Sequence, residues 1–339
     1  MRGQENGGKN GRIITLEEHF VTPAFLEGPG SSMKSRANSA SAPPAARLAQ
    51  VVDLASDLGV KRIAALDAAG IDVQVLSLNS PGVEQLDAAA AMTLARETND
   101  YFASAVQRYP DRLAGFATLP TAVPDQAADE LERMVVQHGF KGAVINGHIQ
   151  GRYLDDSFFW PILERAEALH APIYLHPTVP PQAVVQTYYT GNFAPEVSAV
   201  LAAAGWGWHI ETAVHVLRLI LSGAFDRFPD LQIIIGHLGE ALPFMLPRFD
   251  GTLSQGLTKL DRQVSDYLRQ NINYTFSGFN WTQAFLDLFL QVGVDRILFS
   301  VDYPYGSMEN SRAFLEQLPI SPADKERIAH ANAERLLKL

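Results

Sequence analysis

The sequence predicts an α/β protein with a (β/α)8 (TIM) barrel fold, and three observations support this prediction. Eight short runs are rich in Val, Ile, Leu and Phe and nearly continuously apolar, as strands buried on both faces should be. Amphipathic segments alternate with these runs, which is typical of a parallel sheet. Several runs end in His, Asp or Asn, and active-site residues of such barrels lie at the ends of strands.

The expected strands are spaced so that a helix fits between most of them. They are Ile13–Glu18, Asp72–Leu78, Leu113–Leu119, Gly142–Asn146, Pro172–His176, Leu231–Gly236, Ile272–Ser277 and Ile297–Val301. The clearest expected helices are Asp87–Arg108, Asp125–His138, Ser157–His170 and Glu211–Phe228. An open doubly wound sheet is the alternative, but no glycine-rich phosphate loop follows the first strand. Eight strands favour closure, and we expect residues 13–339 to form one barrel domain.

Two segments interrupt the alternation of strand and helix. Residues 27–44 are rich in Gly, Ser, Ala and Pro, and residues 177–195 follow the fifth expected strand. Both are expected to be long loops. Because each follows a strand that ends in polar residues, both should lie over the C-terminal face of the barrel. The alternative is that they are simple surface connections.

Composition excludes several classes of protein. Of the 339 residues, 47% are hydrophobic, which is enough for one large core. The 27 basic and 37 acidic residues give a net charge of −10, so nucleic acid is not an expected partner. No apolar run reaches the ~18 residues of a membrane span. The chain has no cysteine, which excludes disulfides and thiolate zinc sites and is compatible with a cytoplasmic location.

The first twelve residues have a separate character. Residues 1–12 are rich in Gly and Asn, include one Lys and contain no apolar stretch. A signal peptide would need such a stretch, so we predict a disordered N-terminal tail instead.

Metal-binding side chains lie at three expected strand ends. Glu17 and His19 are two residues apart, so on a strand they point to the same side. His176 and Asp302 follow two later strands. A single histidine in such a position is more often a core residue, but several at one rim of a barrel predict a metal site. Two carboxylates and two imidazoles suit Mn²⁺ first and Zn²⁺ second.

Other features of these strand ends favour a single ion and a proton-transfer residue. Binuclear barrels often use a carbamylated lysine on the fourth strand, but Lys141 lies at the opposite rim, so one ion per chain is expected. Glu240 follows His237 by three residues and can fix the tautomer of its imidazole and raise its pKa. Alternatively, Glu240 only favours a helix N-terminus. Glu18 should point away from Glu17, as a buried or bridging carboxylate in the barrel wall.

Seven motifs in order resemble the amidohydrolase-related, metal-dependent decarboxylases. They are similar to the hydroxybenzoate branch, which contains γ-resorcylate, 2,3-dihydroxybenzoate and salicylate decarboxylases. The motifs are residues 16–20 (LEEHF), 77–81 (SLNSP), 144–147 (VING), 174–177 (YLHP), 211–215 (ETAVH), 236–240 (GHLGE) and 298–304 (LFSVDYP). The Glu-x-His form of the first motif resembles this branch, whereas aminocarboxymuconate semialdehyde decarboxylase and most hydrolase relatives carry His-x-His.

The resemblance implies an amidohydrolase-like barrel with a defined reaction. Glu17, His19, His176 and Asp302 would hold one divalent ion, with His237 beside it and Glu240 behind His237. The reaction would be non-oxidative decarboxylation of an ortho-hydroxy aromatic acid, dihydroxybenzoate-like, and reversible at high bicarbonate. Asp302 is the first candidate for the proton donor and His237 the second. No organic cofactor is expected, because the phenol supplies the electronic activation.

The resemblance also implies residues that bind a small aromatic acid. Asn146 and Arg248 match positions that hold polar groups of the substrate, and Arg248 would act across a contact in a homodimer or homotetramer. Trp208 and Tyr305 match aromatic walls. The alternatives are a surface salt bridge for Arg248 and core packing for the two aromatic residues. His148 departs from the pattern, because an apolar aromatic residue is expected there, and the segment 27–44 also matches poorly.

Two other functions stay open. A metal-bound water could hydrolyse an amide, ester or lactone on the same barrel, and the same residues would serve that reaction. A ligand-binding barrel with a vestigial site is disfavoured, because no ligand position is lost.

Overall fold

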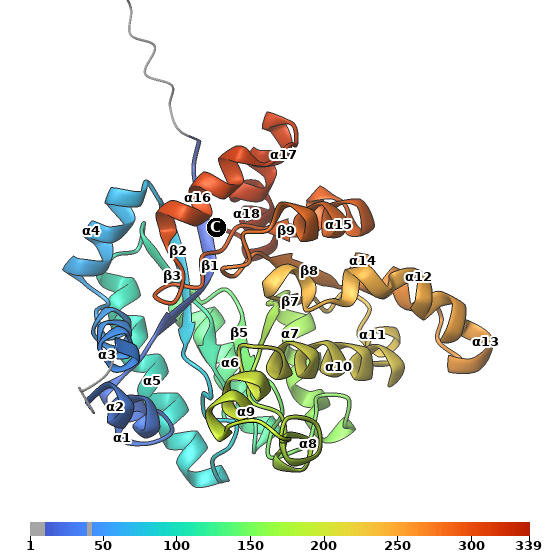
Figure 1. Ribbon diagram of the computed structural model, residues 1–339, viewed down its shortest axis with the longest axis horizontal. Helices are drawn as coiled ribbons and strands as arrows, with labels where there is room; N and C mark the ends of the chain where they lie inside the picture. The colour runs from blue at the N-terminus through green and yellow to red at the C-terminus, as the bar shows by residue number, and fades with distance from the viewer. Residues whose placement is uncertain (1–10, 39–42) are drawn as a thin grey trace, which may run out of the picture.

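A closed barrel of parallel strands lies at the centre of the molecule (Figure 1). The computed structural model describes residues 11–38 and 43–339. The strands are β1 (Ile14–Phe20), β2 (Val73–Leu78), β3 (Leu113–Gly115), β4 (Ala117–Thr118), β5 (Ala143–Asn146), β6 (Ile173–His176), β7 (Ile233–Ile235), β8 (Ile272–Thr275) and β9 (Ile297–Leu298). They pair in two parallel sheets, β1-β2-β3 and β4 through β9 in sequence order.

Two joins close these sheets into one eight-stranded barrel. Phe116 lies between β3 and β4, and its N–H donates to Leu76 O at 2.9 Å, while the next N–H, of Ala117, donates to Gly142 O at 2.8 Å. β3 and β4 are therefore one barrel strand that changes partner at Phe116. At the other join, Leu16 forms a parallel bridge with Ser300. The predicted (β/α)8 barrel is confirmed.

Helices surround the barrel (Figure 1). The α-helices are α1 (Pro23–Glu27), α2 (Ser31–Asn38), α3 (Pro43–Ser56), α4 (Val60–Ala69), α5 (Ala88–Arg108), α6 (Pro124–His138), α7 (Trp160–Leu169), α8 (Gln182–Tyr188), α9 (Pro195–Ala202), α10 (Gly207–Leu221), α11 (Ala224–Arg227), α12 (Leu242–Thr252), α13 (Gln255–Thr258), α14 (Val264–Gln270), α15 (Thr282–Val292), α16 (Met308–Gln317), α17 (Pro322–Glu326) and α18 (Asn332–Leu337). Short turns of other helix types are η1 (Ser157–Phe159), η2 (His237–Gly239), η3 (Val294–Arg296) and η4 (Arg327–Ala331). No helix of the described residues is long and apolar enough to cross a lipid bilayer.

Of the four clearest predicted helices, two are observed as predicted and two are divided in the structure. α5 and α6 agree with the predicted segments to within one residue. The segment 157–170 divides into η1 and α7. The segment 211–228 begins earlier, at Gly207, and divides into α10 and α11.

Of the two predicted long loops, the first is largely helical and the second partly so, and the expectation of loops alone is wrong. The segment 27–44 contains α2 and the start of α3, with residues 39–42 outside the described residues. The segment 177–195 contains α8. Alanine favours helices, and proline is tolerated in a first helical turn, so a composition rich in both does not exclude a helix. The predicted tail of residues 1–12 lies outside the described residues except for Gly11 and Arg12, and Arg12 pairs with Glu334.

The strands separate two hydrophobic cores. Large inward-facing side chains such as Leu16, Phe116 and Tyr174 fill the barrel, because alternate residues of a strand face the axis. Ala333 and Leu337 of α18 pack against this inner cluster. The larger cluster fills the space between the strands and the surrounding helices.

A bulge in β1 determines which side chains enter the barrel. Leu16 pairs with Val75 and Glu18 with Leu76, so Glu17 is an extra residue, with a left-handed φ of 65°. Since Leu16 faces inward, a regular strand would turn Glu17 outward. The bulge brings Glu17 and His19 to the inside together. Their shared side follows from simple alternation, as the sequence predicts, and the bulge makes that side the inner one.

Glu18 faces outward and holds the loop after β9. Its Oε1 accepts a hydrogen bond from Val301 N–H and its Oε2 accepts one from Tyr303 N–H, each at 3.0 Å. Gln74 Nε2 donates to the same Oε2 at 3.2 Å. Asp302 lies between the two residues whose N–H groups bind Glu18, and it has a left-handed φ of 67°. Glu18 is therefore the buried, bridging carboxylate that the sequence predicts.

Replacing Glu18 tests this role. In Glu18→Gln, only one oxygen remains to accept from the N–H groups of Val301 and Tyr303, and the other N–H faces the amide N–H₂ of the glutamine. The free energy of unfolding should therefore fall by about 1–3 kcal/mol. Urea denaturation measures it, with Glu97→Gln on the exposed face of α5 as the matched control. Equal stability of the two variants would contradict the role of Glu18.

Candidate metal centre and active site

A cavity of about 680 Å³ lies at the C-terminal ends of the barrel strands. His19, His176, His237 and Asp302 line its inner end. These residues come from β1, β6 and the segments after β7 and β9. The segments 27–44 and 177–195, here called the helical inserts, also contribute to its wall, through Pro29, Met33, Thr178 and Gln182 among others. The inserts therefore lie over the face of the barrel that the sequence predicts.

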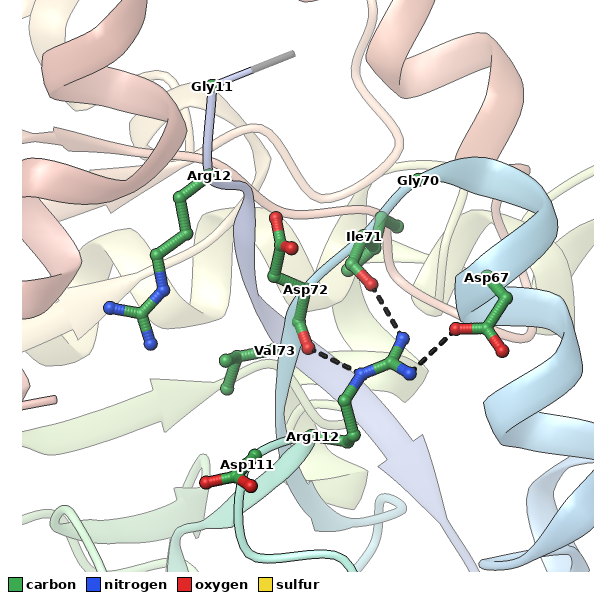
Figure 2. A pocket seen from close by; sticks show the side chains of 9 residues that line it. All are labelled: Gly11, Arg12, Asp67, Gly70, Ile71, Asp72, Val73, Asp111 and Arg112. Atoms are coloured by element: carbon green, nitrogen blue, oxygen red, sulfur yellow. Dashed lines mark hydrogen bonds and ion pairs between the residues drawn. The ribbon is translucent and has the colours of Figure 1, made fainter. Parts of the chain in front are cut away.

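A second cavity lies at the opposite end of the strands (Figure 2). It measures about 530 Å³ and is lined by residues that precede or begin β1, β2 and β3. Its central cation, Arg112, donates to Asp67 Oδ1 at 2.6 Å and to the carbonyls of Ile71 and Asp72 at 3.0 and 2.8 Å. All three side-chain nitrogens of Arg112 thus donate hydrogen bonds within the protein. Because the metal-binding side chains also lie at the other end of the barrel, we place the functional site in the first cavity.

The distances between the polar atoms at the inner end fit one metal ion. Ligand atoms of Glu17, His19 and His176 all lie within 4.8 Å of one another. Glu17 Oε1 is 3.5 Å from His176 Nε2, and His19 Nε2 is 3.0 Å from Asp302 Oδ1. Atoms that share an ion at about 2.1 Å lie roughly 3–4.2 Å apart. The structure therefore brings Glu17, His19 and His176 close enough together to surround one cation, and it places Asp302 3.0 Å from His19.

The two oxygens of Glu17 have different surroundings. Oε2 accepts hydrogen bonds from the hydroxyl groups of Tyr174 and Thr275. Oε1 is buried and has no hydrogen-bond partner among the described residues. Burial, together with the carboxylates of Asp302 and Glu240, raises the pKa of Glu17 to about 8 against the opposing effect of His237. A carboxylate oxygen that is buried and unpartnered in this way fits a cation.

The histidines at the inner end are suited to bind a metal. Burial, and then the neighbouring His19 and His237, hold the pKa of His176 well below its usual value. His176 is therefore neutral at physiological pH, which is the form that ligates metals. The rings of His19 and His176 meet edge to face at 4.8 Å between centroids.

His237 belongs to a chain of hydrogen bonds behind the predicted ligands. Its Nδ1 is 2.7 Å from Glu240 Oε1, and its Nε2 is 3.8 Å from Glu17 Oε1. Burial opposes a charge on His237, but the carboxylates of Glu240 and Glu17 outweigh this effect and raise its pKa to about 10. A bound divalent cation beside Glu17 would lower that value. The geometry favours the orienting role predicted for Glu240.

His209 is a member of this chain that the sequence analysis did not assign. Its Nδ1 is 2.6 Å from Glu240 Oε2, and Trp208 Nε1–H donates to its Nε2 at 3.0 Å. Nε2 also lies 3.2 Å from the carbonyl of Ala204. With Trp208 as donor to Nε2, the tautomer that carries hydrogen on Nδ1 donates to Glu240. Glu240 thus lies between two imidazoles. These three residues are not a second metal centre, because both Nδ1 atoms hydrogen-bond to the carboxylate.

Backbone strain is concentrated at the site. Of the eleven non-glycine residues with positive φ in the described part of the chain, seven lie at or beside the site, among them Glu17 (65°), His237 (51°), Glu240 (54°), Ser277 (46°) and Asp302 (67°). Such conformations each cost about 1–3 kcal/mol and persist where the surrounding structure imposes them. The structure imposes them here through the bulge in β1, the hydrogen bonds of Glu18 and those of Glu240.

The predicted substrate-binding residues divide into two groups. Trp208 and Tyr305 line the cavity. Asn146 is buried at the end of β5, with its N–H donating to Glu84 Oε1 at 2.8 Å, and it does not line the cavity. Arg248 lies exposed on α12, outside the cavity lining.

His148, the predicted departure, lines the cavity wall. Its Nδ1 accepts from Gly151 N–H at 3.0 Å and lies 3.3 Å from Gln85 Nε2, and its Nε2 donates to Val179 O at 3.2 Å. Burial lowers the pKa of His148. His148 is therefore a neutral side chain with both nitrogens engaged, and it ties together three segments of the wall.

The position of Gly236 allows a test of the metal centre. A Cβ there would lie 2.5 and 2.8 Å from the two carboxylate oxygens of Glu17. Since Tyr174 and Thr275 hold Glu17 in place, Gly236→Ala should weaken Mn²⁺ binding by roughly 10–100-fold, as loss of support for a ligand does. Calorimetric titration measures the affinity. The control is Gly251→Ala, where a Cβ meets nothing within 4 Å; equal affinity in both variants would contradict the geometry.

Comparisons with known proteins agree with this site. The model of the family described as "Amidohydrolase" matches residues 43–339. The γ-resorcylate decarboxylase of Polaromonas sp. is 37% identical, over 97% of this chain and 99% of its own. A 2,6-dihydroxybenzoate decarboxylase structure from Rhizobium has a TM-score of 0.85 at 34% identity, covering 97% of this chain and 99% of its own.

A third relative carries a metal in the same fold. The 5-carboxyvanillate decarboxylase of Novosphingobium aromaticivorans, in complex with manganese and 4-hydroxy-3-methoxy-5-nitrobenzoic acid, has a TM-score of 0.88 at 35% identity. The alignment covers 98% of this chain and 97% of that chain. Together with the family match, this full-length similarity shows that the chain belongs to the amidohydrolase family.

Proposed function

We propose that this protein catalyses the non-oxidative, metal-dependent decarboxylation of an ortho-hydroxy aromatic acid of the dihydroxybenzoate type. The observation that carries the proposal is the cluster of Glu17, His19, His176 and Asp302 at the inner end of a cavity. It occurs in a chain that is 37% identical, over nearly its full length, to a γ-resorcylate decarboxylase. The enzyme class is a carbon–carbon lyase.

The four clustered residues would hold one divalent ion. When bound, the ion supplies Lewis-acid stabilisation of negative charge on the substrate oxygens and a fixed point of attachment. Mixed carboxylate and imidazole ligands are compatible with Mn²⁺ and with Zn²⁺. We propose Mn²⁺ first, because the related carboxyvanillate decarboxylase contains manganese, and Zn²⁺ second. The ortho hydroxyl activates the ring, so the proposal needs no organic cofactor.

Asp302 is the proposed proton donor. It lines the cavity with its side chain 21% exposed, and it would carry the proton once the substrate had displaced it from the ion. It delivers this proton to the ring carbon that carries the carboxylate. The bond from that carbon to the carboxylate then breaks, CO₂ leaves, and the electron pair of the bond restores the aromatic ring. At high bicarbonate the same steps run in reverse.

His237 is the second candidate for proton transfer, and Glu240 and His209 position it. Glu240 fixes the orientation of the His237 ring through Nδ1, so that Nε2 faces Glu17. His209 binds the other oxygen of Glu240 and keeps the carboxylate from rotating. Trp208 and Tyr305, which line the cavity, stay in the proposal as substrate-binding residues. Asn146 lies behind the cavity wall, and its contact with substrate stays a prediction from the sequence.

Arg248 and the face of α12 support a proposed homo-oligomer. Phe244 is 75% and Met245 37% exposed on the helix that carries Arg248. A second copy that covers this face would bury apolar surface and could bring Arg248 to a neighbouring cavity. A homodimer or homotetramer is therefore proposed. A single domain over residues 13–339, a cytoplasmic location and the lack of a nucleic-acid partner stay predictions from the sequence.

The relay behind His237 gives a prediction about turnover. Glu240→Gln should lower kcat by roughly 10²–10⁴-fold, the usual range for lost acid–base assistance, while the Mn²⁺ content stays near that of the unaltered protein. His209→Asn should lower kcat less, because Asn can still donate to Glu240. Steady-state kinetics and elemental analysis of the same samples measure both quantities. A kcat for Glu240→Gln equal to that of the unaltered protein would leave Glu240 with a purely structural role.

The reaction itself is tested with paired substrates. An ortho-hydroxybenzoate should lose CO₂, whereas the same acid with its ortho hydroxyl methylated should be inert, because it has no anionic phenol oxygen. In D₂O, the product should carry deuterium at the carbon that lost the carboxylate. Mass spectrometry and CO₂ release measure these outcomes. Cleavage of esters, lactones or amides, with no hydroxybenzoate decarboxylated, would support the hydrolase alternative instead.

A further inference from the structure

The cavity is larger than a single-ring substrate requires. It measures about 680 Å³, and cavities of about 300–1,000 Å³ hold drug-sized ligands. A dihydroxybenzoate has only roughly eleven non-hydrogen atoms, and its reacting carboxylate and hydroxyl must lie at the metal end. Much of the cavity therefore extends beyond the ring of such a substrate.

One wall of the cavity can be followed outward from the metal ligands. The rings of His19 and Tyr305 are 5.7 Å apart between centroids. Tyr305 donates its hydroxyl hydrogen to Asn79 Oδ1 at 2.8 Å, and Asn79 Nδ2 lies 4.0 Å from Met33 Sδ. Met33 on α2 is therefore separated from the ligand His19 by two intervening side chains. The helical insert forms the outer part of the cavity.

The outer part of the wall is apolar. Met33 and Leu48 come from the insert after β1, and Val179, Pro180 and Pro181 come from the segment after β6. Val179 is 45% exposed, and Leu48 is half-buried. The carbonyl of Val179 is held by His148, so its side chain is fixed at the wall. A ligand group that covers these side chains would remove apolar surface from water.

The polar side chains of the wall are largely paired with one another. Ser80 Oγ lies 3.4 Å from Thr178 Oγ1, and Gln85 Nε2 donates to the carbonyl of His148 at 2.6 Å. Of the described residues that line the cavity, none is a lysine, an arginine or a glutamate. Among the described residues of the same chain, a second anionic group on a substrate would therefore find no cation along this wall, which is costly.

We propose that the outer cavity, defined by Met33, Leu48, Val179, Pro180 and Pro181, is a subsite for an apolar substituent. The substrate is an ortho-hydroxybenzoate that carries one carboxylate and an alkyl chain on its ring. This inference rests on the proposed function and specifies its substrate class. The proposed substrate differs from that of a decarboxylase that acts on an acid with a second carboxylate.

The first test uses the unaltered, Mn²⁺-loaded protein and a series of substrates. 2,6-Dihydroxybenzoate is compared with hydroxybenzoates that carry methyl through pentyl chains at each open ring position, and with 5-carboxyvanillate. For at least one ring position, kcat/KM should rise about fourfold for each added methylene until the subsite is full. 5-Carboxyvanillate should have a kcat/KM at least tenfold below that of the best alkyl acid.

The second test fills the subsite. Leu48→Trp should reduce the ratio of kcat/KM for the pentyl acid to that for 2,6-dihydroxybenzoate by at least tenfold. Leu257→Trp is the matched control, because Leu257 is 67% exposed on α13 and lies outside the cavity lining. This control should leave the ratio unchanged. If the Leu48 variant does not fold, the substrate series alone still decides the proposal.

The outcomes distinguish failure of the proposed function from failure of the proposed subsite. If no ortho-hydroxy acid is decarboxylated, the proposed function fails. If 2,6-dihydroxybenzoate is decarboxylated but kcat/KM does not rise with chain length at any position, the subsite is overturned and the function stands. Preference for 5-carboxyvanillate over every alkyl acid would overturn the subsite in the same way.

Discussion

The bulge at Glu17 is the constraint on which the rest of the site depends. One extra residue in β1 turns Glu17 toward the inside of the barrel and Glu18 toward the outside. Glu17 enters the barrel with Leu16 and His19, and Glu18 turns outward to grip the peptide groups on both sides of Asp302. Without the extra residue, the alternation that places Leu16 inside would place Glu17 and His19 outside. Three of the predicted ligands therefore depend on β1: Glu17 and His19 belong to it, and Asp302 is held in place by Glu18.

Burial of so many carboxylates requires that each have a defined partner. Glu18 is satisfied by backbone N–H groups, and Glu240 by His209 and His237. Glu17 differs, because hydroxyl groups satisfy one oxygen and the other is left without a protein partner. An unpaired buried oxygen is destabilising in a protein without a cation. A cation beside Glu17 Oε1 would remove this penalty. His176 Nε2 lies 3.5 Å from that oxygen and can serve as a second ligand of the same cation.

Sequence alone predicted the barrel and the identity of the clustered residues, because these depend on local pattern and strand ends. It could not predict the bulge at Glu17, which is defined only by pairing with β2. It missed His209, whose contact with Glu240 joins positions 31 residues apart across two elements. It also misjudged the segment 27–44, since Ala and Ser are compatible with helix and with loop, and packing against the barrel decides between them.

Anomalous diffraction at the manganese edge, on crystals of the Mn²⁺-loaded protein, tests the central claim most directly. We expect one peak per chain at the inner end of the cavity, within about 2.0–2.3 Å of Glu17 Oε1, of one nitrogen each of His19 and His176, and of Asp302. The second oxygen of Glu17 should keep its hydrogen bonds to Tyr174 and Thr275. Two peaks in this cavity, or a peak that Glu17 does not ligate, would contradict the account.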